Sequence, residues 1–204
     1  GLLAAYAAAY GGPLIRGAVL EDPPVFSTEP AFFPQSFACQ DTYAPLHQYR
    51  LTRREECWEA YYLRRCLWGK LFLPPGLADR LADYAQRYAR RCPDRPVQFF
   101  FLPGSLNSMF LYLRQYDDAF GEMFYDYTWH CGIPHEQLMT DITVPTVFLH
   151  CKDSWTSDGI LLAAASDQQA RRAVELISNC RLTELSSPHN IHLAHPDAFL
   201  SAVE

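Results

Sequence analysis

Apolar residues near the start of the chain fall into two kinds of run. Residues 2–10 combine Ala, Leu and Tyr and are followed by two glycines and a proline, which is typical of a helix and its end. Residues 14–20 form a short apolar run with little alternation, which predicts a strand covered on both faces. Residues 21–24, Glu-Asp-Pro-Pro, end this strand. The chain therefore begins with a predicted helix and a predicted buried strand.

The alternation of strand and helix returns after residue 142. Residues 144–150 predict a second buried strand, and residues 181–185 predict a third. Between them, Ser166 and Gln169 have the spacing of a capping box, which opens a helix running to residue 177. A proline at 196 suits the first position of a last helix. This order of elements is typical of an α/β fold with a parallel sheet.

Residues 26–141 differ in composition, being rich in Tyr, Phe, Trp, Arg and Pro, with helical pieces separated by prolines. Thr52 and Glu55 predict a capping box for a helix that runs to about residue 68, and apolar residues at three- and four-residue steps predict a second helix over 77–92. We therefore expect one long helical insertion. Some of its aromatic side chains are expected to line a pocket, which favours a bulky, mostly apolar substrate.

Composition and charge narrow the function further. The chain has 204 residues, 49% hydrophobic and 20% charged, which predicts a globular protein with one domain. Seventeen Lys and Arg against 23 Asp and Glu give a net charge of −6, which disfavours nucleic acids and anionic membranes as partners. Seven scattered cysteines and the lack of a long apolar stretch favour a cytoplasmic protein with reduced thiols. We expect no metal and no other cofactor.

Separated segments resemble the α/β-hydrolase family, in the order that this family has them. Residues 1–6 (GLLAAY) resemble the helix that follows the family's nucleophile turn, and residues 15–24 resemble the next strand and its turn. Residues 142–153 are similar to the penultimate core strand, and residues 187–199 (SPHNIHLAHPDAF) to the catalytic-histidine loop and the last helix. The resemblance implies that residues 1–25 and 142–204 form part of the hydrolase core and that residues 26–141 form a helical cap.

The same resemblance implies catalytic roles for a histidine and one of two aspartates. His189 is the expected general base, because a loop at the carboxyl edge of a parallel sheet can bring an imidazole to a nucleophile. Two carboxylates are candidates for the acid that orients His189. Asp153 follows the penultimate strand, and Asp22 is at the alternative position that certain haloalkane dehalogenases and lactone hydrolases use. Asp158 is a weaker substitute for Asp153.

The family's nucleophile lies in a Gly-x-Ser-x-Gly turn directly before the helix that here begins at residue 1. The sequence contains no such turn, so we expect the C-terminal part of a longer hydrolase or one piece of a split protein, inactive by itself. Serine-type hydrolysis of an ester, lactone or similar carbonyl is the favoured activity. An Asp nucleophile acting on carbon–halogen or epoxide substrates, and a non-catalytic binding module, are the alternatives. The expected partners are a small-molecule substrate and a complementing N-terminal fragment or a second copy.

Overall fold

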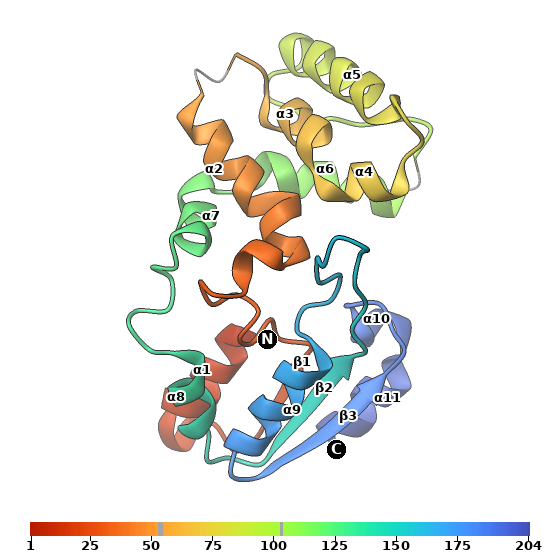
Figure 1. Cartoon of the computed structure of the whole chain (residues 1–204). Coiled ribbons are helices and arrows are strands. Elements are labelled where there is room, and N and C mark those ends of the chain that lie inside the picture. The colour runs from red at the N-terminus through yellow and green to blue at the C-terminus, as the bar shows by residue number, and fades with distance from the viewer. Residues whose placement is uncertain (53–54, 103) are drawn as a thin grey trace. The chain divides into compact units, whose positions relative to one another are not determined.

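A parallel sheet organises the structure, a computed structural model that describes residues 1–52, 55–102 and 104–204 apart from the side chains of residues 105, 106 and 109. Within these residues the sheet has three strands, in the order β1 (Ala18–Glu21), β2 (Thr146–Cys151) and β3 (Cys180–Leu185). Figure 1 shows these strands as neighbouring arrows. Leu20 of β1 is in register with Phe148 of β2, which is in register with Leu182 of β3. The predicted α/β fold with a parallel sheet is confirmed.

Helices cover both faces of this sheet because successive side chains of a strand point to opposite faces. Leu20 and Phe148 face one core cluster, and Val19 and Leu149 face another. The first cluster contains residues of α1 (Leu2–Tyr10), α8 (His135–Thr140) and α9 (Asp167–Leu176). The second contains residues of α10 (Ile191–Ala194) and α11 (Pro196–Val203). The sheet is thus a layer between helices, as its near-continuous apolar strands predict.

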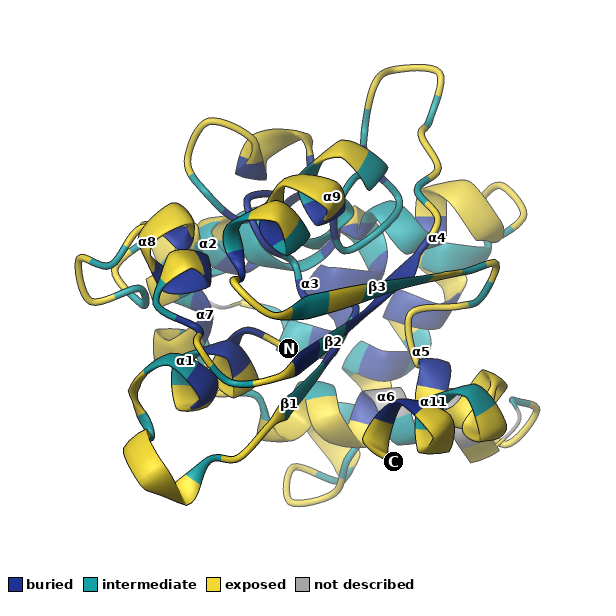
Figure 2. Ribbon diagram, turned by 90° about the horizontal axis from the view of Figure 1, so that it is seen from below, coloured by how far each residue is buried: buried dark blue, intermediate teal, exposed yellow. Residues whose placement is uncertain are grey.

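The middle strand is the most deeply buried of the three, and it is the dark blue strand in Figure 2. Both of its neighbours hydrogen-bond to it, and helices lie over both of its faces. Phe148 and Leu149 are fully buried, as expected for apolar residues at this position. His150 is also fully buried. A buried titratable side chain needs partners, and those of His150 are the carboxylates of Asp22 and Asp167.

The start of α9 is fixed by the capping box that the sequence predicts. The Ser166 hydroxyl accepts a hydrogen bond from the Gln169 amide at 3.2 Å, and the Gln169 side chain accepts one from the Ser166 amide at 2.9 Å. Each side chain satisfies an amide that the first turn of the helix leaves without a partner. This prediction is confirmed. The capping box also fixes the position of Asp167, the first residue of α9.

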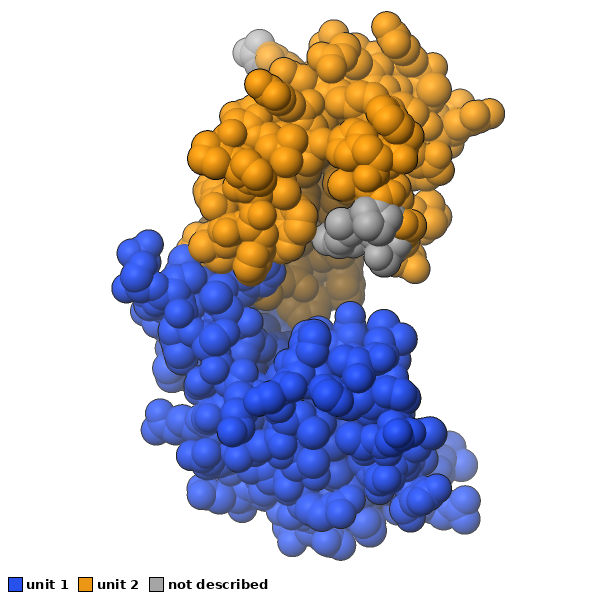
Figure 3. Space-filling view, turned by 90° about the vertical axis from the view of Figure 1, so that its right-hand side faces the viewer, with its two compact units in different colours: residues 1–37, 127–204 blue, residues 38–126 orange. Residues whose placement is uncertain are grey.

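The chain divides into two compact units, coloured separately in Figure 3. Residues 1–37 and 127–204 form the unit that contains the sheet, and residues 38–126 form a helical unit. The expected insertion was wider, at residues 26–141. Its two flanks belong with the sheet because Phe26 and Leu138 are buried in the core that also contains Phe148. None of the helices in the described residues is both long and apolar enough to cross a membrane.

The helical unit has its own core, which includes Leu63, Ala82 and Phe99. Its helices are α2 (Ala44–Leu51), α3 (Trp58–Arg65), α4 (Leu67–Phe72), α5 (Leu77–Arg91), α6 (Gly104–Gln115) and α7 (Asp118–Tyr125). The helix predicted over 77–92 is confirmed as α5. The capping box predicted at Thr52 and Glu55 is wrong, because Thr52 ends α2 and its hydroxyl donates to the Tyr49 carbonyl.

Candidate active site

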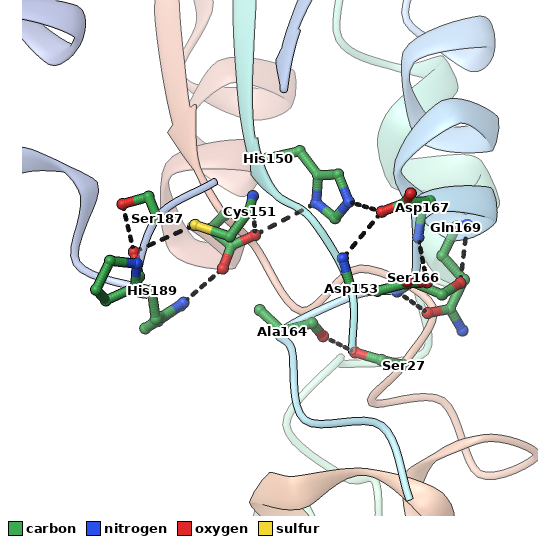
Figure 4. A network of polar contacts seen from close by, with 12 residues as sticks. Ser27, His150, Cys151, Asp153, Ala164, Ser166, Asp167, Gln169, Ser187 and His189 are labelled. Atoms are coloured by element: carbon green, nitrogen blue, oxygen red, sulfur yellow. Dashed lines mark hydrogen bonds and ion pairs between the residues drawn. The ribbon is translucent and has the colours of Figure 1, made fainter. Parts of the chain in front are cut away.

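Polar side chains gather where the carboxyl ends of the three strands meet. Asp22 directly follows β1, His150 and Cys151 end β2, and His189 lies in the loop after β3. Figure 4 shows the network of hydrogen bonds and ion pairs that joins this edge to the start of α9. Ligands and catalytic groups of open α/β sheets are commonly found at this edge, because the loops that leave parallel strands converge there.

Asp22 and His189 contact one another although they are far apart in the sequence. The Nδ1 atom of His189 lies 2.8 Å from Oδ2 of Asp22. An ionised carboxylate can only accept a hydrogen bond, so His189 carries its proton on Nδ1 and donates it to Asp22. The other ring nitrogen, Nε2, makes no hydrogen bond to any described residue, and 63% of the His189 side chain is exposed. Nε2 is therefore available to exchange a proton with a substrate or nucleophile.

Asp22 is held in place by the backbone around it. Its side chain is 1% exposed, and its Oδ1 accepts a hydrogen bond from the Cys151 amide at 3.1 Å. Its own amide donates to the Leu149 carbonyl at 2.8 Å, and it adopts a φ of 37°, in the left-handed region that few non-glycine residues occupy. Pro23 and Pro24 follow and restrict the turn. The carboxylate is thus held in place by the fold itself.

Electrostatics favour the ionised form of Asp22. Burial opposes ionisation, but contacts with His150, His189 and the Cys151 amide lower the pKa of Asp22 to about 2. The hydrogen bond to Asp22 in turn raises the pKa of His189 from its ordinary value, against the effect of burial. A buried carboxylate that stays ionised can hold an imidazole in one tautomer and stabilise it when it takes up a proton.

Asp153, the other candidate acid, does not contact His189. Its Oδ2 accepts a hydrogen bond from the Asp167 amide at 2.9 Å, and its own amide donates to Oδ1 of Asp167 at 3.0 Å. The loop after β2 therefore turns toward α9, where Asp153 satisfies one amide of the first turn. Asp158 is exposed, and its Oδ1 lies 3.5 Å from the hydroxyl of the neighbouring Ser157. Of the three candidate carboxylates, the fold brings only Asp22 to His189.

The first residue of α1 lies beside the same pair. A Cβ built on Gly1 would lie 2.5 Å from the Cβ of Pro23, so the helix begins directly against the turn that holds Asp22. The partial positive charge at the beginning of this helix therefore acts at the edge where His189 is exposed.

His150 is a member of this site that the sequence analysis did not single out. Its Nε2 lies 2.9 Å from Oδ1 of Asp167, and its Nδ1 lies 3.4 Å from Oδ1 of Asp22. The one signal in the sequence is a titratable residue at the end of an apolar strand, and an ordinary core histidine gives the same signal.

In the part of the chain that the structure describes, no three His, Cys, Asp or Glu side chains are grouped as metal ligands.

Comparisons with known proteins give two distant likenesses to report. No protein-family model and no curated protein matches the sequence. The structure is similar to that of the enol-lactonase from Burkholderia xenovorans LB400, with 16% identity and a TM-score of 0.49, over 99% of this chain and 60% of that chain. It is also similar to MenH from S. aureus, with 20% identity and a TM-score of 0.43, over 98% of this chain and 62% of that one. The chain thus spans about three fifths of the length of these two proteins.

Proposed function

We propose that the chain carries the acid–base part of a serine-type hydrolase of the α/β-hydrolase family. His189 is the general base, and Asp22, rather than Asp153, is the carboxylate that orients it. One observation carries this proposal: a buried carboxylate with a lowered pKa lies 2.8 Å from Nδ1 of an imidazole whose side chain is 63% exposed at the carboxyl edge of the sheet. The substrate class is an ester, lactone or similar carbonyl compound.

The chemistry follows from the two nitrogens of His189. Nε2 takes the proton of a serine hydroxyl as its oxygen attacks the carbonyl, and Asp22 stabilises the resulting imidazolium through Nδ1. The same proton then passes to the leaving oxygen. In the second half of the reaction His189 activates water, which releases the acyl group and restores the serine.

The serine is assigned to a segment that adjoins Gly1 and lies outside these 204 residues. The position of Gly1 beside Pro23, in the turn that holds Asp22, supports this assignment. The beginning of α1 also offers a favourable potential for the negative oxygen of the tetrahedral intermediate. A bulky, mostly apolar substrate is part of the proposal, because residues 38–126 are rich in aromatic side chains and ligand pockets are commonly lined by such residues.

The test uses a longer protein, expressed from the coding sequence of residues 1–204 together with the coding sequence directly upstream of residue 1. We expect it to react with a fluorophosphonate probe and to hydrolyse p-nitrophenyl esters or simple lactones. His189→Ala lowers kcat/KM about 10³-fold or more, because the nucleophile loses its base. His195→Ala is the matched control, since His195 is an exposed histidine near the same loop, and it leaves kcat/KM unchanged.

Several outcomes separate this proposal from its rivals. Turnover of alkyl halides or epoxides without fluorophosphonate labelling would point to an Asp nucleophile. A folded protein with neither labelling nor turnover would indicate a binding module. Residues 1–204 alone are expected to be inactive, so ester turnover by this chain that disappears in His189→Ala would overturn the assignment of the serine to another segment.

A further inference from the structure

His150 is placed between two carboxylates that belong to different parts of the fold. Asp167 lies at the start of α9, and its Oδ1 is 2.9 Å from Nε2 of His150. Asp22 lies in the turn after β1, and its Oδ1 is 3.4 Å from Nδ1. The imidazole side chain has no exposed surface. His150 thus lies beside Oδ1 of Asp22, and His189 lies beside Oδ2.

This geometry determines which protonation state of the His150 imidazole is favoured. Nε2 must carry a hydrogen, because the Asp167 carboxylate beside it can only accept. If Nδ1 were unprotonated, its lone pair would face the Asp22 carboxylate oxygen across 3.4 Å, with no hydrogen bond to any described group. Two electron-rich atoms opposed in a buried site repel each other, whereas a protonated Nδ1 attracts the carboxylate.

We propose that His150 is a positioning residue of the His189–Asp22 pair: held as an imidazolium between Asp167 and Asp22, it keeps the Asp22 carboxylate ionised and directed at His189. The positive charge stabilises the anion on Oδ1, so Oδ2 remains free to accept from His189. Asp167 anchors the imidazolium from the other side. The inference rests on the proposed function only where it invokes catalysis.

The charged groups around His150 agree with a cation at this position. Burial disfavours the charge, but Asp22 and Asp167 together raise the pKa of His150. Asp153 is joined to Asp167 by two hydrogen bonds, each from the amide of one residue to the carboxylate of the other, so its negative charge also lies near His150. From β3, Glu184 is in register with His150, and its carboxylate lies 3.1 Å from Arg171 of α9. The neighbouring carboxylates therefore outnumber the neighbouring cations.

The first experiment needs no substitution and no substrate. Nuclear magnetic resonance of the protein with ¹⁵N-labelled histidine reports the protonation of each ring nitrogen as the pH changes. We expect both nitrogens of His150 to be protonated at pH 7, with loss of a proton above the ordinary range of a histidine. A neutral His150 at pH 7 would overturn the proposal.

Two variants then test the coupling to His189. His150→Gln keeps hydrogen-bonding groups but removes the positive charge, so the titration of His189 shifts upward by about half a unit or more. Asp167→Asn removes the anchor on the partly exposed side and lowers the titration midpoint of His150. Asp167→Asn is the safeguard if His150→Gln does not fold. An unmoved His189 titration in a folded His150→Gln variant contradicts the inference.

The pH dependence of catalysis distinguishes this positioning role from a purely structural one. In an active protein, the acidic limb of kcat/KM reports the ionisation of His189, and we expect His150→Gln to shift this limb upward by the same amount. A packing role predicts an equal loss of activity at every pH. The two proposals fail separately: coupled titrations without any turnover contradict the proposed function alone, and turnover with an unmoved His189 contradicts the present inference alone.

Discussion

The turns after β1 and β2 each carry one aspartate at neighbouring ends of parallel strands, yet the two carboxylates have different surroundings. Asp22 is buried between two imidazoles and accepts a backbone hydrogen bond from Cys151. Asp153 is half-buried; its carboxylate accepts from the Asp167 amide, and its amide donates to the Asp167 carboxylate. Both are aspartates close to a strand end: Asp22 is the first residue after β1, and Asp153 is the second after β2. The direction in which the chain leaves the strand decides which carboxylate can orient a base and which one caps a helix.

The largest expected effect separates the two aspartates by activity. In the protein extended by the segment encoded upstream of residue 1, Asp22→Asn should lower kcat by about 10³- to 10⁴-fold. A neutral amide neither fixes the tautomer of His189 nor stabilises its imidazolium. Asp153→Asn should change kcat less than about threefold, since the Asp153 carboxylate accepts from the Asp167 amide in α9 and does not contact His189. Ester hydrolysis by both variants, with circular dichroism to verify folding, measures the difference. Equal losses would abolish the distinction between the two turns.

A second difference concerns the stability of the chain in acid. The pKa of Asp22 is about 2 in the folded protein and about 3.8 in an ordinary environment, so ionised Asp22 stabilises the fold above pH 4, and this contribution disappears as the pH falls toward 2. The shift corresponds to about 2 kcal/mol in the free energy of unfolding. Urea unfolding between pH 2 and pH 5 should show this loss for the wild type and not for Asp22→Asn. A parallel pH dependence of the two proteins would contradict the buried ion pair.

Much of the sheet and its helices could be predicted from local pattern. The run over residues 2–10, the buried strand ending in His150 and the cap at Ser166 depend on neighbours in sequence, and all three are present in the structure. Thr52 shows the limit of this reasoning. It has the residue type and spacing of a capping box, but its hydroxyl donates to the helix that ends there. A local motif does not say whether a helix ends or begins at it.

The site could be predicted only as a set of candidates. His189, Asp22 and Asp153 all follow strands of a parallel sheet, which places each of them at one edge. The choice between the aspartates depends on the left-handed backbone of Asp22 and on the path of the loop toward α9, and both arise from tertiary packing. His150 gave no distinguishing signal, because its two acidic partners are brought to it by the fold.

The smallest expected effect concerns Asp153, whose carboxylate accepts a hydrogen bond from the first turn of α9. Asp153→Ala removes the acceptor of the Asp167 amide and a negative charge near the start of α9, so it should lower the free energy of unfolding by about 1 kcal/mol. Asp158→Ala is the matched control, because this exposed aspartate lies in the same loop and its change should stay within about 0.5 kcal/mol. Urea unfolding at neutral pH measures both. If Asp153→Ala were as mild as the control, the two hydrogen bonds to Asp167 would not stabilise the helix, and the loop after β2 would follow this path for other reasons. If it instead abolished activity, Asp153 would act on His189 through Asp167 and His150, and the two turns would work together rather than separately.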